Sequence, residues 1–241
     1  MNILAIDASG VAGSVAYIRD GKLAGEYYIC HKLTHSETIM PMLEHMRDLI
    51  GIDLENLDAV AVTSGPGSFT GLRIGVTTAK ALAMALNVPV VGIPTLDALA
   101  HNMTHTSATI CPIMDARRNQ VYTAVYKWEN DELKRLTDHL ACDMDEHLEM
   151  LATKEEDILF LGDGVDVYRE KIVSKLGERA LFAPGFLNLQ RASTLAEAAC
   201  KAYARGESCD AASFVPIYLR KSQAEREREE RLAKEQAHGN C

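Results

Sequence analysis

The chain has 241 residues, of which 47% are hydrophobic, enough for one large domain or two small lobes with a full core. Its net charge of −9 disfavours a direct, dominant role in binding RNA or DNA, because that affinity comes mainly from Lys and Arg that neutralise phosphates. No apolar run is long enough to span a bilayer, and the apolar start contains Asp7 and no basic region, so we expect a strand rather than a signal peptide and a cytoplasmic protein.

The first hundred residues alternate between strand and helix patterns. Residues 3–8 predict a strand, and residues 14–19 and 23–29 flank the hairpin turn Asp20-Gly21. A helix follows, and its start from Thr34 to Glu37 has the spacing of a capping box. The rest of this half predicts, in order, a strand over 59–62, a glycine-rich loop, a helix over 72–86, a strand over 88–93 and a short helix over 96–103.

The pattern then restarts with a strand over 109–114 that ends in Asp115, as the first strand ends in Asp7. It continues with strands over 121–126 and 133–136, a helix over 143–151, a strand over 158–161, and helices over 167–176 and 194–205. Two such rounds predict two related α/β lobes, over residues 1–105 and 106–222. Residues 223–241 are almost all polar with alternating charges, and we expect a solvated tail.

A glycine-rich run, Gly-Pro-Gly-Ser-Phe-Thr-Gly over residues 65–71, joins a predicted strand to a predicted helix. Such a loop can bring bare backbone N–H groups close to an anion or close to a partner backbone. It lacks the lysine of a Walker loop, because Gly71 is followed by Leu72 and Arg73. Gly67 and Ser68 are therefore candidates for a place near a nucleotide, and the residues leave both readings open.

The acids at the two strand ends are the other candidates for such a site. Asp7, beside Ser9, could hold Mg²⁺ through water near a nucleotide phosphate, although a lone Asp more often caps a strand end. Asp115 ends the corresponding strand of the second round, and Gly162-Asp163-Gly164 follows a later strand. These residues keep open the alternative of an autonomous nucleotide-binding ATPase.

We expect no metal site and no catalytic residue. His31 and His35, like His101 and His105, are four residues apart but have no accompanying carboxylate motif, and no pair among the six cysteines has CxxC spacing. Ser68 does not lie in the GxSxG pattern of α/β-hydrolases, and nothing local marks a base for it.

Two helices of the first lobe have faces suited to a protein partner. The helix that begins near Thr34 carries three methionines, and the helix over 72–86 is rich in small residues that permit close helix packing, although either feature also suits a core. We expect Met40→Glu or Gly75→Arg to weaken association with a partner without unfolding the chain. The candidate partner-binding residues are His35, Ile39, Met40, Leu43, Gly71, Arg73, Gly75 and Thr78.

About residues 1–225 resemble the TsaB (YeaZ) family of bacterial proteins. The resemblance rests on five segments: residues 6–9, 34–37, 64–75, 115–122 and 216–225. In one place Asp7-Ala8-Ser9 stands where the family usually has Asp-Thr-Ser. The resemblance implies a two-lobed actin/Hsp70/sugar-kinase-like fold with ribonuclease-H-like lobes. It also implies the non-catalytic paralogue of TsaD, because the HxExH-type metal motif of TsaD is absent from this sequence.

By this resemblance the chain would pair with TsaD, the ATPase TsaE would join, and the complex would transfer a threonylcarbamoyl group to N6 of adenosine 37 in tRNAs that read ANN codons. The partner surface would use the first two helices of the first lobe, and the chain would form a homodimer when alone. We expect no cofactor and no catalysis by the chain itself, ATP, ADP and Mg²⁺ only in the complex, and tRNA contact only through it. The remaining alternatives are an ATPase and, from an older family label, a glycoprotease-like peptidase.

Overall fold

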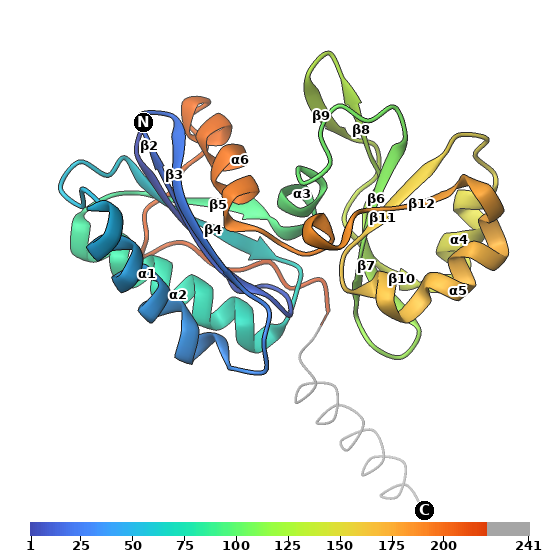
Figure 1. The fold of residues 1–241 in the computed structure, drawn as a ribbon, viewed down its shortest axis with the longest axis horizontal. Helices are drawn as coiled ribbons and strands as arrows, with labels where there is room; N and C mark the ends of the chain where they lie inside the picture. Colours follow the sequence, from blue (N-terminus) through green and yellow to red (C-terminus); the bar gives the residue numbers. More distant parts are fainter. Residues whose placement is uncertain (221–241) are drawn as a thin grey trace, which may run out of the picture.

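A computed structural model describes residues 1–220, so the expected tail over 223–241 lies outside the described residues. Two lobes, each built on a mixed β-sheet, stand side by side (Figure 1). No helix in this described part is both long and apolar enough to cross a membrane.

The first sheet has the strand order β3-β2-β1-β4-β5. Its first three strands form antiparallel hairpins, whereas β4 and β5 run parallel to β1. Strands β1 and β4 are buried along their whole length, as expected for strands covered by helices on both faces. The strands are β1 (Ile3–Asp7), β2 (Gly13–Arg19), β3 (Lys22–Ile29), β4 (Ala59–Gly65) and β5 (Val90–Pro94).

Helices α1 (His35–Ile50) and α2 (Phe69–Leu86) cover one face of this sheet (Figure 1). The predicted capping box is present, because Thr34 and Glu37 satisfy each other's backbone N–H groups at the start of α1. Helix α1 ends at Gly51, whose left-handed backbone returns its N–H to the Arg47 carbonyl. The apolar sides of both helices join β1, β2 and β4 in one core.

The second sheet repeats the same order as β10-β7-β6-β11-β12, with an added hairpin of β8 and β9. Two further helices cover it, α4 (Met144–Ala152) and α5 (Gly164–Leu176), and short 3₁₀ turns lie at Gly177–Arg179 and Gly185–Leu187. The strands are β6 (Thr109–Asp115), β7 (Gln120–Thr123), β8 (Tyr126–Glu129), β9 (Glu132–Arg135), β10 (Leu140–Asp143), β11 (Ile158–Leu161) and β12 (Ala180–Phe182).

The structure differs from expectation within the second sheet. The strand expected over 121–126 is two strands, because β7 pairs with β10 whereas β8 turns to pair with β9. Strands β10 and β12 were not expected. Both are short and partly exposed, so they lack the apolar run or strict alternation by which strands are found in sequence.

The last helix of the second round packs on the first lobe, and the last helix of the first round packs between the two lobes. Helix α3 (Thr95–Ala100) places Leu96 and Leu99 in a core with strands of the second sheet, whereas α6 (Ala192–Ala204) buries Leu195 and its alanines against the first sheet. The expected second lobe over 106–222 is corrected accordingly, since the chain returns to the first lobe at α6. The repeated sheet with its paired helices is the two-lobed actin/Hsp70/sugar-kinase-like fold.

Candidate functional site

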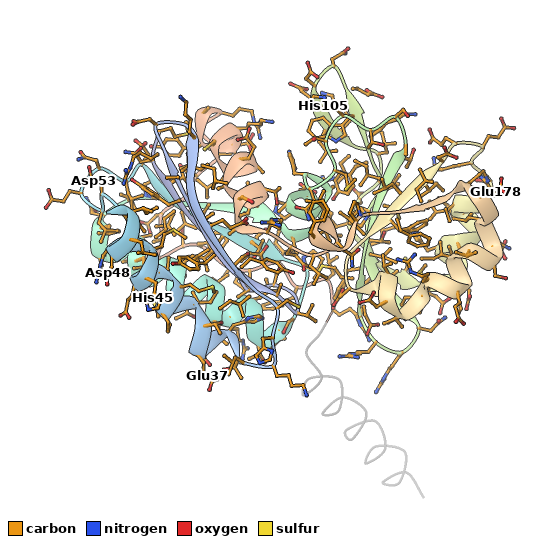
Figure 2. The ribbon with its side chains drawn as sticks, viewed as in Figure 1. Glu37, His45, Asp48, Asp53, His105 and Glu178 are labelled. Atoms are coloured by element: carbon orange, nitrogen blue, oxygen red, sulfur yellow. The ribbon has the colours of Figure 1, made fainter. Side chains whose placement is uncertain are left out.

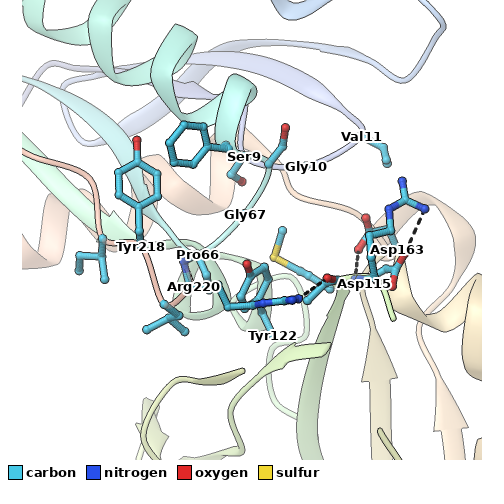
Figure 3. Close-up of a pocket in the computed structure, with 17 residues that line it drawn as sticks. Ser9, Gly10, Val11, Pro66, Gly67, Asp115, Tyr122, Asp163, Tyr218 and Arg220 are labelled. Carbon is cyan, nitrogen blue, oxygen red and sulfur yellow. Dashed lines mark hydrogen bonds and ion pairs between the residues drawn. The ribbon is translucent and has the colours of Figure 1, made fainter. Parts of the chain in front are cut away.

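A cleft of about 320 Å³ lies between the lobes, where four of the five segments that carry the family resemblance meet (Figure 3). Residues 9–11 follow β1, residues 66–69 belong to the glycine loop, residues 114–117 end β6, and residues 217–220 close the described chain. Tyr122 and Asp163 complete the lining. Of the residues expected near a nucleotide, the structure brings Ser9, Gly67, Ser68 and Asp115 together here.

The glycine loop packs on backbone rather than presenting all its amides to the cleft. A Cβ atom on Gly67 would lie 2.4 Å from the Ser9 carbonyl oxygen, and one on Gly71 would lie 2.0 Å from the Ala8 carbonyl oxygen. The Ser68 N–H donates to the Ser9 carbonyl oxygen at 2.7 Å. The sequence left two roles open for these glycines, anion binding and close approach to another backbone segment. In the structure they allow the second, and the neighbouring segment is the chain's own backbone at Ala8 and Ser9.

Asp7 lies behind this lining, fully buried. Its Oδ1 accepts hydrogen bonds from the Ser9 N–H at 2.9 Å, the Ser9 hydroxyl at 2.6 Å and the Thr63 hydroxyl at 3.2 Å. Burial raises the pKa of Asp7, and the bonds from Ser9 and Thr63 offset part of that rise. Asp7 thus ties the end of β1 to β4, which is the role of a strand-end cap.

Asp115 and Asp163 come together in the cleft from neighbouring strand ends (Figure 3). The Asp115 N–H donates to Asp163 Oδ1 at 3.1 Å, and the Arg117 guanidinium lies 3.3 Å from the Asp115 carboxylate. Burial raises the pKa of Asp163. Asp163 comes from the Gly162-Asp163-Gly164 turn that was weighed for the ATPase alternative, and the structure places it beside Asp115 in the cleft. The sequence feature that points to Asp163 as a cleft residue is its position just after a strand, β11, which resembles the positions of Asp7 and Asp115.

The lining also brings together residues that no local sequence pattern relates to one another. Tyr218 and Arg220 come from the end of the described chain, about a hundred residues from Ala116, yet Arg220 Nη1 donates to the Ala116 carbonyl oxygen. Such a pairing depends on the path of the chain and has no local pattern.

No group of three His, Cys, Asp or Glu side chains within residues 1–220 is placed to hold a metal ion. Two of the four histidines weighed earlier bond to the backbone instead. His35 Nε2 donates to the Gly10 carbonyl oxygen at 2.9 Å, and His101 Nδ1 donates to the Asp97 carbonyl oxygen at 2.8 Å. The absence of a metal from the function of the chain stays a prediction.

A buried cysteine–histidine pair in the second lobe was not foreseen, because its members are distant in sequence. Cys111 Sγ lies 3.3 Å from His147 Nε2, and Thr123 is in contact with both. Burial raises the pKa of Cys111 to about 12 and lowers that of His147 to about 4. Both side chains are therefore neutral at pH 7, and the pair is a part of the core rather than an activated nucleophile.

The candidate partner-binding residues divide into two groups. Met40 is 43% exposed and Arg73 is also exposed, whereas His35 and Thr78 are half-buried. The other four pack inside the first lobe: Ile39, Leu43, Gly71 and Gly75.

This burial changes one expectation about a substitution. A Cβ atom on Gly75 would lie 3.3 Å from the Ala8 Cβ, so the residue faces the sheet. Gly75→Arg would therefore disturb the lobe itself, contrary to the expectation that it would spare the fold. Met40→Glu remains a surface change.

The outer surface of α1 and α2 nevertheless has the features of an interface. Only two of the eighteen residues of α2 are charged, Arg73 and Lys80, and its exposed positions include Thr77, Ala81 and Met84. Figure 2 shows Glu37, His45 and Asp48 along the outer rim of α1. We call the exposed side of these two helices the α1–α2 face.

Comparison with known proteins agrees with the geometry. A family model described as "TsaD: tRNA N6-adenosine threonylcarbamoyltransferase" matches residues 31–228. The tRNA threonylcarbamoyladenosine biosynthesis protein TsaB of Bacillus subtilis is 35% identical over 93% of this chain and 96% of its own length, and that of Escherichia coli is 28% identical over the same shares. The solved structure of YeaZ from Pseudomonas aeruginosa is 28% identical, covers 90% of this chain and 99% of its own, and has a TM-score of 0.74. The chain belongs to the TsaB family, within the wider group that the TsaD model describes.

Proposed function

We propose that this chain is a non-catalytic subunit that pairs with TsaD in the cytoplasm and supports transfer of a threonylcarbamoyl group to N6 of adenosine 37 in tRNAs that read ANN codons. The two TsaB relatives, both named for threonylcarbamoyladenosine biosynthesis, support a role in that process, and the family model supports a common fold with the transferase.

The observation that carries the pairing is the α1–α2 face. Its exposed positions combine the small side chains Thr77 and Ala81 with the apolar side chains Met40 and Met84, which are 43% and 62% exposed. Small residues allow a second pair of helices to approach closely, and methionine adapts to the surface that it meets. A paralogue with the same fold offers a corresponding helix pair, so it can replace one copy of a symmetric dimer. We infer that the same face forms the homodimer when the chain is alone.

The other components of the reaction, an ATPase and its nucleotide, are expected to come from outside this chain. We propose that TsaE joins the pair and that ATP, ADP and Mg²⁺ act only in the assembled complex. The Ser68 amide already bonds within the chain, so the glycine loop does not offer this N–H group to an anion, which supports the absence of a cofactor of its own. The net charge of −9 supports tRNA contact through the complex rather than through this chain.

Reconstitution tests this proposal. Threonylcarbamoylation of tRNA is measured with TsaD, TsaE and a carbamoyl adenylate source, with and without the chain. We expect modification only when the chain is present, and none from the chain without TsaD. Equal activity in its absence, or transfer by the chain alone, contradicts the proposal.

Asp115 and Asp163 favour one second candidate, an autonomous nucleotide-binding ATPase, because both carboxylates line the interlobe cleft. Calorimetry of the isolated chain with ATP and Mg²⁺ separates the two functions. Heat of binding that disappears in Asp115→Asn favours the ATPase, whereas no heat at millimolar ATP leaves the subunit role.

A further inference from the structure

The chain does not end at α6 but returns along the first lobe. The backbones of Cys209 and Val90 exchange two hydrogen bonds of 2.9 Å, which adds this segment to the edge of β5. Farther along, Lys80 Nζ on α2 donates to the carbonyl oxygens of Ala212 and Phe214 at 3.1 and 2.8 Å. These contacts direct the last described residues toward the interlobe cleft.

The glycine loop then forms a seat for Ile217. The Ile217 N–H donates to the Ser64 carbonyl oxygen at 2.6 Å. Gly65 has a φ of +108°, and a Cβ atom there would lie 2.3 Å from the Ile217 carbonyl oxygen. Any other residue at Gly65 would be strained and would displace this carbonyl. The loop is therefore shaped to receive the segment.

Beyond this seat the segment reaches both lobes. The Tyr218 ring stacks on Phe69 at the start of α2, with ring centres 4.7 Å apart, and the Arg73 guanidinium lies 4.1 Å from the centre of the Phe69 ring. Arg220 donates to the Ala116 carbonyl oxygen, which belongs to the loop between β6 and β7 in the second lobe. Residues 217–220 thus join the glycine loop of one lobe to a strand-end loop of the other.

The lobes are also joined elsewhere, by a residue after α3, residues before α6 and the first turn of α6 itself. Asn102 Nδ2 donates to the carbonyl oxygens of Leu187 and Leu189, both at 2.8 Å, and the Thr194 hydroxyl donates to Asn102 Oδ1 at 2.8 Å. In Figure 1 this junction lies near α3, between the lobes, whereas the described chain leaves from the lower side. The junction around Asn102 therefore has the position of a hinge, and the few contacts of residues 217–220 on the other side have the position of a latch.

We propose that residues 217–220 are an internal latch, which holds the interlobe cleft closed by tying the glycine loop to the β6–β7 loop and controls access to the cleft by its release. The latch rests on one backbone hydrogen bond, one ring pair and one arginine contact, few enough for release without unfolding a lobe. This inference does not depend on the proposed role in tRNA modification.

Hydrogen–deuterium exchange of the full chain tests the latch. The double variant Tyr218→Ala/Arg220→Ala removes the ring pair and the arginine contact. We expect exchange about tenfold faster in peptides covering residues 61–72 and 114–122, with no change in β11 at residues 158–161. Val215→Ala is the matched control, because Val215 lies in the same segment, is 74% exposed and is not among the cleft-lining residues. It should exchange as the native chain does.

Two results overturn the proposal. One is unchanged exchange around the cleft in the double variant. The other is an unprotected Ile217 amide in the native chain, because a seated latch must protect it. If the double variant instead exchanges faster throughout both lobes, it has lost its fold rather than its latch. Ile217→Pro, which removes the seated N–H and keeps Tyr218 and Arg220, is then measured in its place, and unchanged exchange over 114–122 in that variant also overturns the proposal.

Discussion

The two lobes share one strand order but differ in their outer helices. In the second lobe, α4 and α5 are tied by ion pairs of Lys171 with Asp145 at 2.8 Å and of Lys175 with Glu149. In the first lobe, no ion pair among the described residues joins α1 to α2, and α2 instead exposes small and apolar side chains. The outer side of α1 is charged as well, with Glu37, Glu44 and Asp48 exposed, so the difference between the lobes lies in α2, whose exposed side is small and apolar.

The strand ends differ in a related way. Asp7 is buried and ties β1 to β4, whereas Asp115 in the equivalent position is only partly buried and lines the cleft. The first-lobe loops are closed by backbone packing on Ala8 and Ser9. Repetition of a fold therefore does not repeat its chemistry, and each strand end has to be interpreted from its own contacts.

Substitution of the loop glycines should produce the largest difference between the lobes. Gly71→Ala would place a Cβ atom 2.0 Å from the Ala8 carbonyl oxygen, whereas Gly164→Ala in the second lobe meets the Ile113 carbonyl oxygen at 2.9 Å. We expect Gly71→Ala to lower the free energy of unfolding by about 3 kcal/mol and Gly164→Ala by about 1 kcal/mol. Urea unfolding measures both, and equal losses would contradict the closer backbone approach at Gly71 than at Gly164.

Acid should weaken the second lobe through His147. Burial lowers its pKa to about 4, so between pH 6.5 and 4 the unfolded chain binds a proton that the folded chain does not. Stability from this group is complete above pH 6.5 and is lost as the pH falls. We expect a loss of about 2 kcal/mol between pH 8 and pH 5.

The pH dependence of His147→Gln isolates this effect. Urea unfolding at several pH values gives the free energy of unfolding of the native chain and of the variant. We expect the two free energies to approach each other as the pH falls, because glutamine does not titrate. A constant difference between the two free energies from pH 8 to pH 5 would mean that His147 takes up its proton in the folded state as readily as in the unfolded state.

The smallest effect is expected for the ion pairs of the α4–α5 face. Lys175→Met removes the pair with Glu149, a residue that is 70% exposed, and exposed pairs contribute little because water screens them. We expect a change of about 0.5 kcal/mol in the free energy of unfolding and no change in association with TsaD. Loss of association in this variant would place the interface on the second lobe and would contradict a partner site on the α1–α2 face.

The sequence predicted most of the architecture because local patterns carry it. The capping box at Thr34, the hairpin turn at Asp20-Gly21 and the acids at two strand ends all lie where expected. The return of α6 to the first lobe and the place of α3 between the lobes could not be predicted, because an apolar helix face does not indicate which sheet it will meet. The pairing of Arg220 with Ala116 has the same non-local origin.

The candidate partner face was predicted only in part for a similar reason. Helical spacing places Ile39, Met40 and Leu43 on a helix but does not say which side faces the sheet. The structure buries Ile39 and Leu43 and exposes Met40. The glycines of α2 are likewise explained by the close approach of β1, which appears only in three dimensions.

The affinity of TsaD for matched variants of the two faces tests the central claim most directly. Ala81→Arg adds bulk and charge to the exposed side of α2, and Val167→Arg makes the same change on α5, where the valine is 58% exposed. Calorimetric titration with TsaD should show at least about a tenfold weaker affinity for Ala81→Arg and native affinity for Val167→Arg. Native affinity for Ala81→Arg, with the variant folded, would contradict a partner site on the α1–α2 face.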